Sequence, residues 1–299
     1  MKWLIYGAVL CGSFLLFLYW TFPHEQLKER LIAMVQAQLG DEFQLRIASL
    51  DSHWVTGLEL SDIELQHRVG DRMEPWLQAD RATLRVGPMT LLFGQPRATF
   101  TVTVADGEID GAVRKADDVV TMSAQFNALA LDAIPMLQTV TGLRLRGAVD
   151  GTIQLESNLH QIKSARGTVS MTLDDWNILK ESQLKLGGLG AVDLDEAFVL
   201  TEGKDSAIEI EINRGTMQVS ALRLTGGDIE LDLSGQIFFE QRFQNSRMNI
   251  KGGVAFSEKL KSLVPVAMFG PASPDTGRYP VELVGRVSHL RRKIGTFTF

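Results

Sequence analysis

Apolar and polar residues follow three successive patterns along the chain. Residues 3–22 form an uninterrupted apolar stretch, residues 23–40 carry apolar residues at helical spacing, and from residue 41 onward apolar and polar residues alternate. A change from a 3.6-residue to a two-residue period marks a change from helix to strand. The sequence therefore predicts a transmembrane anchor at 1–22, an amphipathic helix at 23–40 and a mainly β domain at 41–299.

The apolar stretch from Trp3 to Phe22 contains no charged residue. As a helix of twenty residues it would be about 30 Å long, which matches the hydrocarbon core of a bilayer. Aromatic residues that suit the membrane interfaces stand near both ends, namely Trp3, Tyr6, Tyr19 and Trp20. A cleaved signal peptide is the alternative, but its apolar core is usually shorter, and no small-residue cleavage site follows here. We therefore expect a retained single-pass anchor.

Positively charged residues give the orientation of this anchor a slight bias. Lys2 precedes the stretch, whereas Lys28 and Arg30 follow it closely. Because positive residues favour the cytoplasmic side of a membrane, we expect the amino terminus in the cytoplasm and the rest of the chain outside it.

The predicted amphipathic helix has a start signal at Pro23 and a stop signal at Gly40. Its apolar residues recur at helical spacing and are Leu27, Leu31, Met34, Val35 and Leu39. Such a stripe usually packs against its own domain, although it could also lie on a membrane surface.

Alternating runs fill the chain beyond Gly40, as in "ATFTVTV" and "AIEIEI". Alternation is typical of a sheet with one wet face and one dry face, and the absence of long helices between the runs argues against a parallel α/β fold. Changes of phase predict hairpins. One across Asp106-Gly107 would pair Val104 with Ile109, and another is expected across Arg214-Gly215.

Two longer segments keep one phase through an Asp-Gly or Ser-Gly pair and therefore predict single strands. Their apolar residues are Leu143, Leu145, Val149, Ile153 and Leu155 in the first segment, and Ile229, Leu231, Leu233, Ile237 and Phe239 in the second. Gly147, Gly151 and Gly235 share the apolar phase, where a missing side chain lets a sheet bend toward that side. We expect a long, curved antiparallel sheet that these apolar residues line from inside.

Composition excludes several classes of function. The chain has 299 residues with a formal net charge of -6 and no basic run, which argues against the clustered cations that nucleic-acid binding requires. Its single cysteine, Cys11, lies inside the apolar stretch, so the β domain has no thiol for a disulfide, a zinc site or a nucleophile.

Enzyme motifs are also missing. The five histidines are scattered without the spacing of metal ligands, and no G-x-S-x-G elbow, P-loop or dinucleotide fingerprint occurs. Asp193, Asp195 and Glu196 lack the other parts of an EF-hand. We expect no catalytic residue, metal or cofactor. Residues 257–274 could form a lid or a membrane-touching loop, but we favour the alternative, a short helix that closes the core.

The stretch "LALDAIPMLQTVTGLRLRGAVDGTIQLE" at 129–156 resembles the signature of AsmA-like proteins, with Pro135, Gly142, Gly147 and Asp150-Gly151 as its most specific part. The layout of the amino terminus and the overall length are similar to the GspN family of type II secretion, a group related to AsmA-like proteins. The basic residues Arg291, Arg292 and Lys293 depart from the ending expected in that family.

The resemblance implies a β-groove in the periplasm, anchored in the bacterial inner membrane by one pass. AsmA-like relatives imply that the groove holds or conducts acyl chains of phospholipid or another lipid. Each buried methylene is worth about 0.8 kcal/mol, so such binding needs no specific polar contact. The alternative is a structural scaffold of an envelope secretion complex without a lipid ligand, whose partners would be other type II secretion or envelope proteins.

Overall fold

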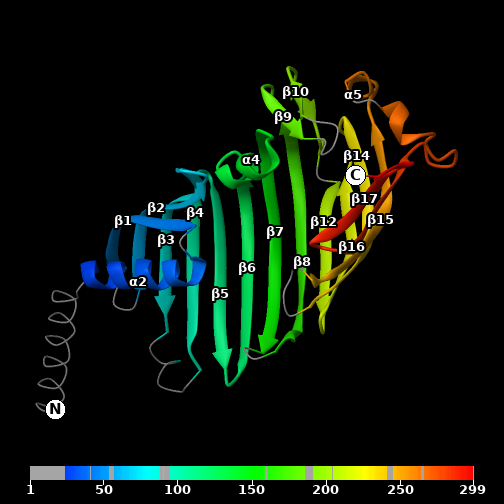
Figure 1. The fold of residues 1–299 in the computed structure, drawn as a ribbon. Coiled ribbons are helices and arrows are strands. Elements are labelled where there is room, and N and C mark those ends of the chain that lie inside the picture. The colour runs from blue at the N-terminus through cyan, green and yellow to red at the C-terminus, as the bar shows by residue number, and fades with distance from the viewer. Residues whose placement is uncertain are drawn as a thin grey trace, which may run out of the picture.

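The segments in which apolar and polar residues alternate form one large antiparallel sheet that extends through most of the chain (Figure 1). The structure is a computed structural model that describes residues 24–40, 42–53, 57–87, 90, 95–158, 161–185, 191–203, 205–240, 245–263 and 266–298. The predicted anchor, including Trp3, Tyr6, Tyr19 and Trp20, lies outside these residues. No helix among the described residues is both long and apolar enough to cross a membrane.

Among the described residues, the large sheet has sixteen strands. Its first eight are β1 (Phe43–His53), β2 (Gly57–Val69), β3 (Arg72–Val86), β4 (Arg97–Val104), β5 (Gly107–Ala116), β6 (Val119–Ala130), β7 (Leu145–Asn158) and β8 (Gln161–Ile178). The others are β11 (Phe198–Val199), β12 (Ser206–Asn213), β13 (Thr216–Leu224), β14 (Ile229–Phe238), β15 (Arg247–Phe256), β16 (Tyr279–Arg286), β17 (His289–Ile294) and β18 (Phe297–Thr298). Strands β9 (Ser182–Lys185) and β10 (Ala191–Leu194) form a separate hairpin.

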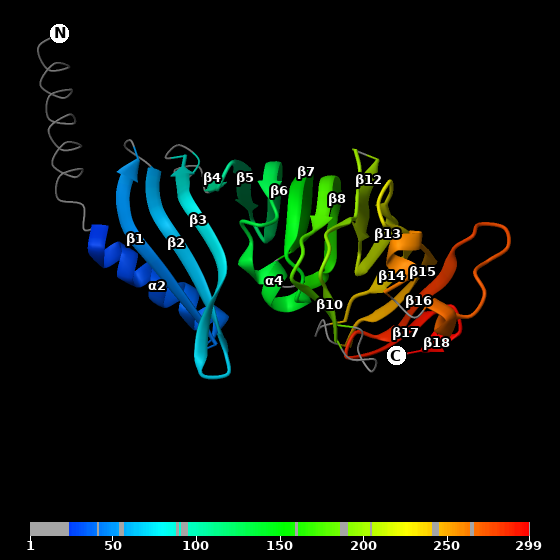
Figure 2. The ribbon, with the colours of Figure 1, turned by 90° about the horizontal axis from the view of Figure 1, so that it is seen from above.

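Strands that follow one another in sequence are neighbours in the sheet, except that β12 pairs directly with β8. All strand pairings in the described part of the chain are antiparallel, for example between β7 and β8. Figure 2 shows that the sheet curves, with α4 (Pro135–Thr141) and β10 on its inner side. The prediction of a mainly β chain with one long, curved antiparallel sheet is confirmed.

The two predicted hairpins form, but one has a different register. Arg214 and Gly215 make the turn between β12 and β13, as expected, with φ angles of +45° and +84°. In the other hairpin the turn residues are Ala105 and Asp106, so Val104 pairs with Gly107 instead of Ile109. Gly107 is needed in the strand because a Cβ there would lie 2.7 Å from the carbonyl oxygen of Ala128.

The two predicted long strands continue through their glycines. β7 passes through Asp150-Gly151 and β14 passes through Ser234-Gly235 without reversal. Their ends differ slightly from the prediction, since Leu143 precedes β7 and Phe239 follows β14.

Three strands contain an interior residue with positive φ that the sequence pattern did not reveal. Asp62 in β2, Ala128 in β6 and Asp175 in β8 have φ angles of +50°, +48° and +49°. At Ala128 and Asp175 the pairing register shifts, as in a β-bulge. The Asp150 carboxylate accepts a hydrogen bond of 2.8 Å from the Ala128 backbone and supports the first of these bulges.

Helix α2 (His24–Leu39) packs against β1 and β2. Leu27, Leu31 and Ile32 contact a core cluster that contains Ile47 and Leu50. This confirms that the stripe packs on its own domain in its first half. Met34 and Leu39 in the second half are exposed.

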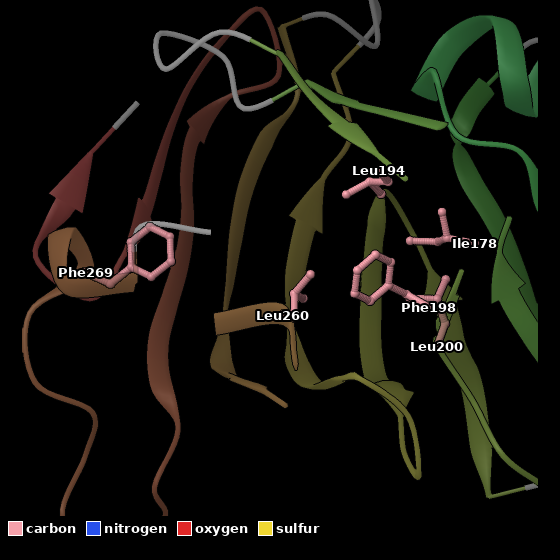
Figure 3. Close-up of a cluster of buried hydrophobic side chains, with 6 residues drawn as sticks. All are labelled: Ile178, Leu194, Phe198, Leu200, Leu260 and Phe269. Carbon is pink, nitrogen blue, oxygen red and sulfur yellow. The ribbon is translucent and has the colours of Figure 1, made fainter. Parts of the chain in front are cut away.

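A second layer packs on the carboxyl-terminal part of the sheet, far along the sheet from α2. α5 (Glu258–Lys261) and the 3₁₀ helix η3 (Val266–Phe269) place Leu260 and Phe269 in a buried cluster. Figure 3 shows these two residues with the others of the cluster, Ile178, Leu194, Phe198 and Leu200. The interpretation of residues 257–274 as a short helix that closes the core is therefore confirmed, and Leu263, which follows α5, is exposed.

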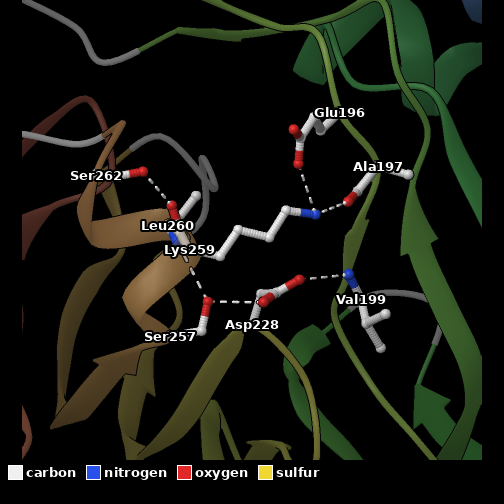
Figure 4. Close-up of polar contacts among 8 residues, drawn as sticks. All are labelled: Glu196, Ala197, Val199, Asp228, Ser257, Lys259, Leu260 and Ser262. Atoms are coloured by element: carbon white, nitrogen blue, oxygen red, sulfur yellow. Dashed lines mark hydrogen bonds and ion pairs between the residues drawn. The ribbon is translucent and has the colours of Figure 1, made fainter.

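Asp228 holds this second layer in place, as Figure 4 shows. Its carboxylate accepts hydrogen bonds from the Val199 backbone at 2.9 Å and from the Ser257 hydroxyl at 2.7 Å. The same hydroxyl accepts from the Leu260 backbone and caps α5. Three segments that are far apart in sequence are thus joined at one side chain.

Candidate functional site: the apolar face of the sheet

Cross-strand register aligns apolar residues of ten strands, β4 to β8 and β12 to β16, into transverse rows on one face. Row A contains Ala98, Val113, Met122, Leu155, Gly167, Ile212, Met217, Ile237, Met248 and Gly285. Row B contains Phe100, Gly111, Ala124, Ile153, Val169, Ile210, Val219, Gly235, Ile250 and Leu283. Row C contains Val102, Ile109, Phe126, Gly151, Met171, Ile208, Leu222, Leu233, Gly252 and Val281.

Every member of these rows is apolar or glycine, and we call their common surface the apolar face. Row C continues to Ala82, Leu60 and Leu50 in β3 to β1. Since Leu50 and Leu60 form the cluster that α2 contacts, α2 lies on the apolar face as well. Helix α4 lies on it too, through Ile134 and Leu137.

Most of the predicted lining residues meet on this face. Leu155 and Ile237 belong to row A, Ile153 to row B and Leu233 to row C. Val149 and Leu231 lie two residues beyond row C, in clusters that continue the apolar face.

The ends of the two predicted segments are less regular. Leu145 and Ile229 lie at strand ends and pack under the second layer, together with Leu143, which is outside the strand. Phe239 also lies outside its strand, and its backbone N–H donates to the carbonyl oxygen of Gly215 at 2.7 Å.

The apolar face has more buried residues over β13 to β16 than over β4 to β8, although Met217, Met248 and Leu283 on the later strands are also half-buried. Val219 and Ile250 of row B are 3% and 6% exposed and belong to one buried cluster. Six larger residues of rows A and B on the earlier strands are only half-buried, namely Phe100, Val113, Met122, Ile153, Leu155 and Val169, whereas Ala124 of row B is buried. This half-buried set is the candidate site.

The predicted bending glycines let neighbouring strands approach closely. A Cβ on Gly151 would lie 2.5 Å from the carbonyl oxygen of Ser170 in β8. Gly235 has φ +153°, a value that L side chains rarely adopt, and a Cβ there would overlap with the backbone of β15. Both positions thus exclude a side chain, as expected for tight curvature toward the apolar face.

Gly147, the third predicted bending glycine, also makes room for a side chain. With φ +144° it lies opposite a bulge in β8, where Asp175 and Trp176 stand against one residue of β7. A Cβ on Gly147 would be 2.6 Å from the Trp176 ring. That ring donates from Nε1 to the Ala148 carbonyl oxygen at 3.0 Å and packs between two buried clusters. Gly147 therefore makes room for a tryptophan at the border of the apolar face that lies beyond row C.

The opposite face of the sheet is polar. Gln236 donates to Gln218 at 2.7 Å, and Thr101 donates to Asp110 at 2.7 Å across neighbouring strands. Glu230 and Asp232 contact Arg278 at 3.1 and 3.7 Å. We call this surface the outer face.

No group of metal-ligating side chains gathers among the described residues. Asp193 accepts a hydrogen bond from Gln183, and Glu196 pairs with Lys259 at 3.2 Å. The pKa of Lys261 is raised, mainly by its hydrogen bond to Glu258, but both residues belong to α5 and lie away from the half-buried set.

Sequence reasoning missed the contributions of β4 to β6 and β8 to the site. Phe100 and Val113 stand in the predicted hairpin across Asp106-Gly107, and Met122 and Val169 stand in the alternating part of the chain, but none of the four was assigned to the lining of the sheet. A signal was available, because hairpin register transfers the face of one strand to the next.

Comparison with known proteins gave no match to any family model, to any curated protein or to any solved structure.

Proposed function

We propose that this chain holds or conducts the acyl chains of a lipid on its apolar face, as the resemblance to AsmA-like proteins implies. The observation that carries the proposal is the half-buried set on β4 to β8, which is continuous with the buried clusters of the apolar face. Large apolar patches left open to water in a folded protein usually mark binding surfaces. The patch has no polar group to choose a headgroup, which suits a hydrocarbon ligand.

The shape of the site also suits an acyl chain. Neighbouring strands lie about 4.8 Å apart, so the half-buried set spans roughly 20 Å across β4 to β8. A chain lying across the strands would contact Phe100, Ile153 and Val169 of row B in succession. In this proposal the apolar stretch at 3–22 anchors the protein in the bacterial inner membrane, and the sheet lies in the periplasm.

Lipid analysis tests this function directly. The full chain is purified in lipid nanodiscs and in a mild detergent, extracted, and examined by mass spectrometry against a membrane-anchored control protein without a β domain. Phospholipid in excess of the control in both preparations is the expected result. Equal lipid in the two proteins would overturn the proposal.

A structural scaffold of an envelope secretion complex is the second candidate. It is favoured by β1, an eleven-residue strand that pairs only with β2 among the described strands. An unpaired strand edge can accept a strand from another protein. A photo-crosslinker at Gln44 in β1 would capture a secretion or envelope partner if this candidate is right, and would give no intermolecular product if it is wrong.

A further inference from the structure

A cluster of positive side chains lies on the outer face at the carboxyl-terminal end of the sheet. Arg247 of β15, Arg286 of β16 and Arg291 of β17 line a depression of about 770 Å³ together with Lys251. All three arginines are exposed. We call these four residues the basic patch.

Register brings the positive charges close together. Arg247 stands directly opposite Arg286, and Arg291 stands opposite Val284, which is two residues before Arg286. Directly opposite side chains have Cβ atoms about 5 Å apart, and like charges at such positions are destabilising. The chain as a whole has a net charge of -6, so this concentration of positive charge does not follow from its composition.

Nearby carboxylates do not neutralise the arginines. Glu240 and Glu282 also line the depression, but Glu240 pairs with Lys163 at 3.3 Å. Glu282 stands in register between Lys251 and Lys293. Among the described residues, no carboxylate forms an ion pair with Arg247, Arg286 or Arg291. Their charge is therefore available to an external anion.

An exposed aromatic ring borders the patch. Phe238 of β14 stands directly opposite Arg247 and is 43% exposed. Arginine binds phosphate oxygens through two parallel hydrogen bonds, and an exposed aromatic residue beside basic residues is typical of surfaces that contact a lipid interface. An acidic protein surface would explain the arginines but gives no reason for an exposed phenylalanine among them.

We propose that the basic patch and Phe238 bind the surface of an anionic phospholipid membrane, with the arginines on the lipid phosphates and Phe238 at the headgroup level. This interaction goes beyond the proposed function, because it uses the outer face and would persist if the apolar face held no lipid.

The test uses the full chain embedded in nanodiscs of zwitterionic phosphatidylcholine, so that the apolar stretch at 3–22 is already occupied. These nanodiscs are mixed with vesicles of phosphatidylcholine containing about 30% phosphatidylglycerol, and binding is measured by co-flotation. The variant combines Arg247→Glu, Arg286→Glu and Arg291→Glu. The matched control combines Arg46→Glu, Arg68→Glu and Arg72→Glu, which are exposed positions of β1 to β3 with the same change in charge.

We expect the wild type and the control to bind anionic vesicles, and binding of the patch variant to fall by on the order of 100-fold, since each basic residue near an anionic surface contributes roughly a fivefold gain. Circular dichroism checks that both triple variants fold. If the triple patch variant does not fold, the single variant Arg286→Gln replaces it, and a partial loss of vesicle binding by this variant supports the proposal. Equal binding by both triple variants, or equal binding to neutral vesicles, would overturn the proposal. So would calorimetry showing that inorganic phosphate binds the patch as tightly as the vesicles do.

Discussion

Gly235 and Ile250 face each other across the β14–β15 ladder so closely that a Cβ on the glycine would lie 2.7 Å from the Cα of the isoleucine. This approach occurs in row B, where β13 also carries a bulge opposite the Ser234-Gly235 step. Bulges and glycines together increase local bending of a sheet. The glycine is therefore part of the curvature that encloses the apolar face.

Substitution of Gly235 by alanine should destabilise the protein markedly. The new methyl group would collide with the backbone of β15, and the φ angle of +153° is unfavourable for alanine, so we expect a loss of about 2–4 kcal/mol in the free energy of unfolding. Denaturant titration measures the loss. Gly253→Ala in the neighbouring strand is the control, because its Cβ would come no closer than 3.1 Å to any atom and would meet the Arg278 side chain before any backbone atom. Similar losses in the two variants would contradict this account of Gly235.

Glycine at position 105 should stabilise the protein. Ala105 adopts φ +51° in the β4–β5 turn, where an L residue costs roughly 1 kcal/mol relative to glycine. Its backbone N–H donates to the Asp80 carboxylate at 2.8 Å, a bond that Ala105→Gly retains. We expect a gain of about 0.5–1 kcal/mol by denaturant titration, whereas Ala112→Gly inside β5 should lose a similar amount. A loss at both positions would count against the turn geometry.

Asp228→Ala should cost far more stability than Asp232→Ala. Removing the Asp228 carboxylate leaves the Val199 backbone and the Ser257 hydroxyl without their acceptor, which we expect to cost about 1–3 kcal/mol. Asp232 contacts Arg278 only at 3.7 Å on the surface, where ion pairs contribute about 0–1 kcal/mol. Thermal melting of both variants gives the comparison. Equal melting temperatures would show that the second layer does not depend on Asp228.

A charge on the apolar face should expel bound lipid, whereas the same charge on the outer face should not. Leu155→Glu places a carboxylate in row A, and Gln154→Glu places it one residue away on the outer face. Burying a charge against an acyl chain is unfavourable, so we expect the lipid-to-protein ratio, measured by mass spectrometry, to fall several-fold in Leu155→Glu alone. Retention of lipid in both variants would place the ligand elsewhere.

Phase alone predicted the fold class and the continuity of β7 and β14, because a strand with one dry face must keep its apolar residues two apart. It failed at Ala128 and Asp175, where a bulge exchanges the faces and no glycine marks the position in the sequence. It also misplaced one hairpin turn, since Gly107 serves a close approach to β6 and the adjacent Ala105 adopts the positive φ. Local pattern therefore predicts which segments are strands better than it predicts their partners.

The candidate site was predicted for β7 and missed for β4 to β6 and β8. Ile153 and Leu155 stand in a long run whose face was evident, whereas Met122 and Val169 obtain their place only through pairing with them. The exposure of individual apolar residues on this face could not be predicted from the sequence. Whether an apolar residue is covered depends on where α4 and α5 pack, and both depend on distant parts of the chain.

The nearly sequential order of the strands has a consequence for how this protein can form and change. Each hairpin can add to the edge left by the one before it. The sheet can therefore start to form with few contacts between residues that are distant in sequence, and this favours rapid and progressive folding. A pair of strands could be gained or lost within the run from β4 to β8 with new partners only for the two strands that flank the pair. The width of the apolar face is thus a variable that evolution or design can adjust two strands at a time.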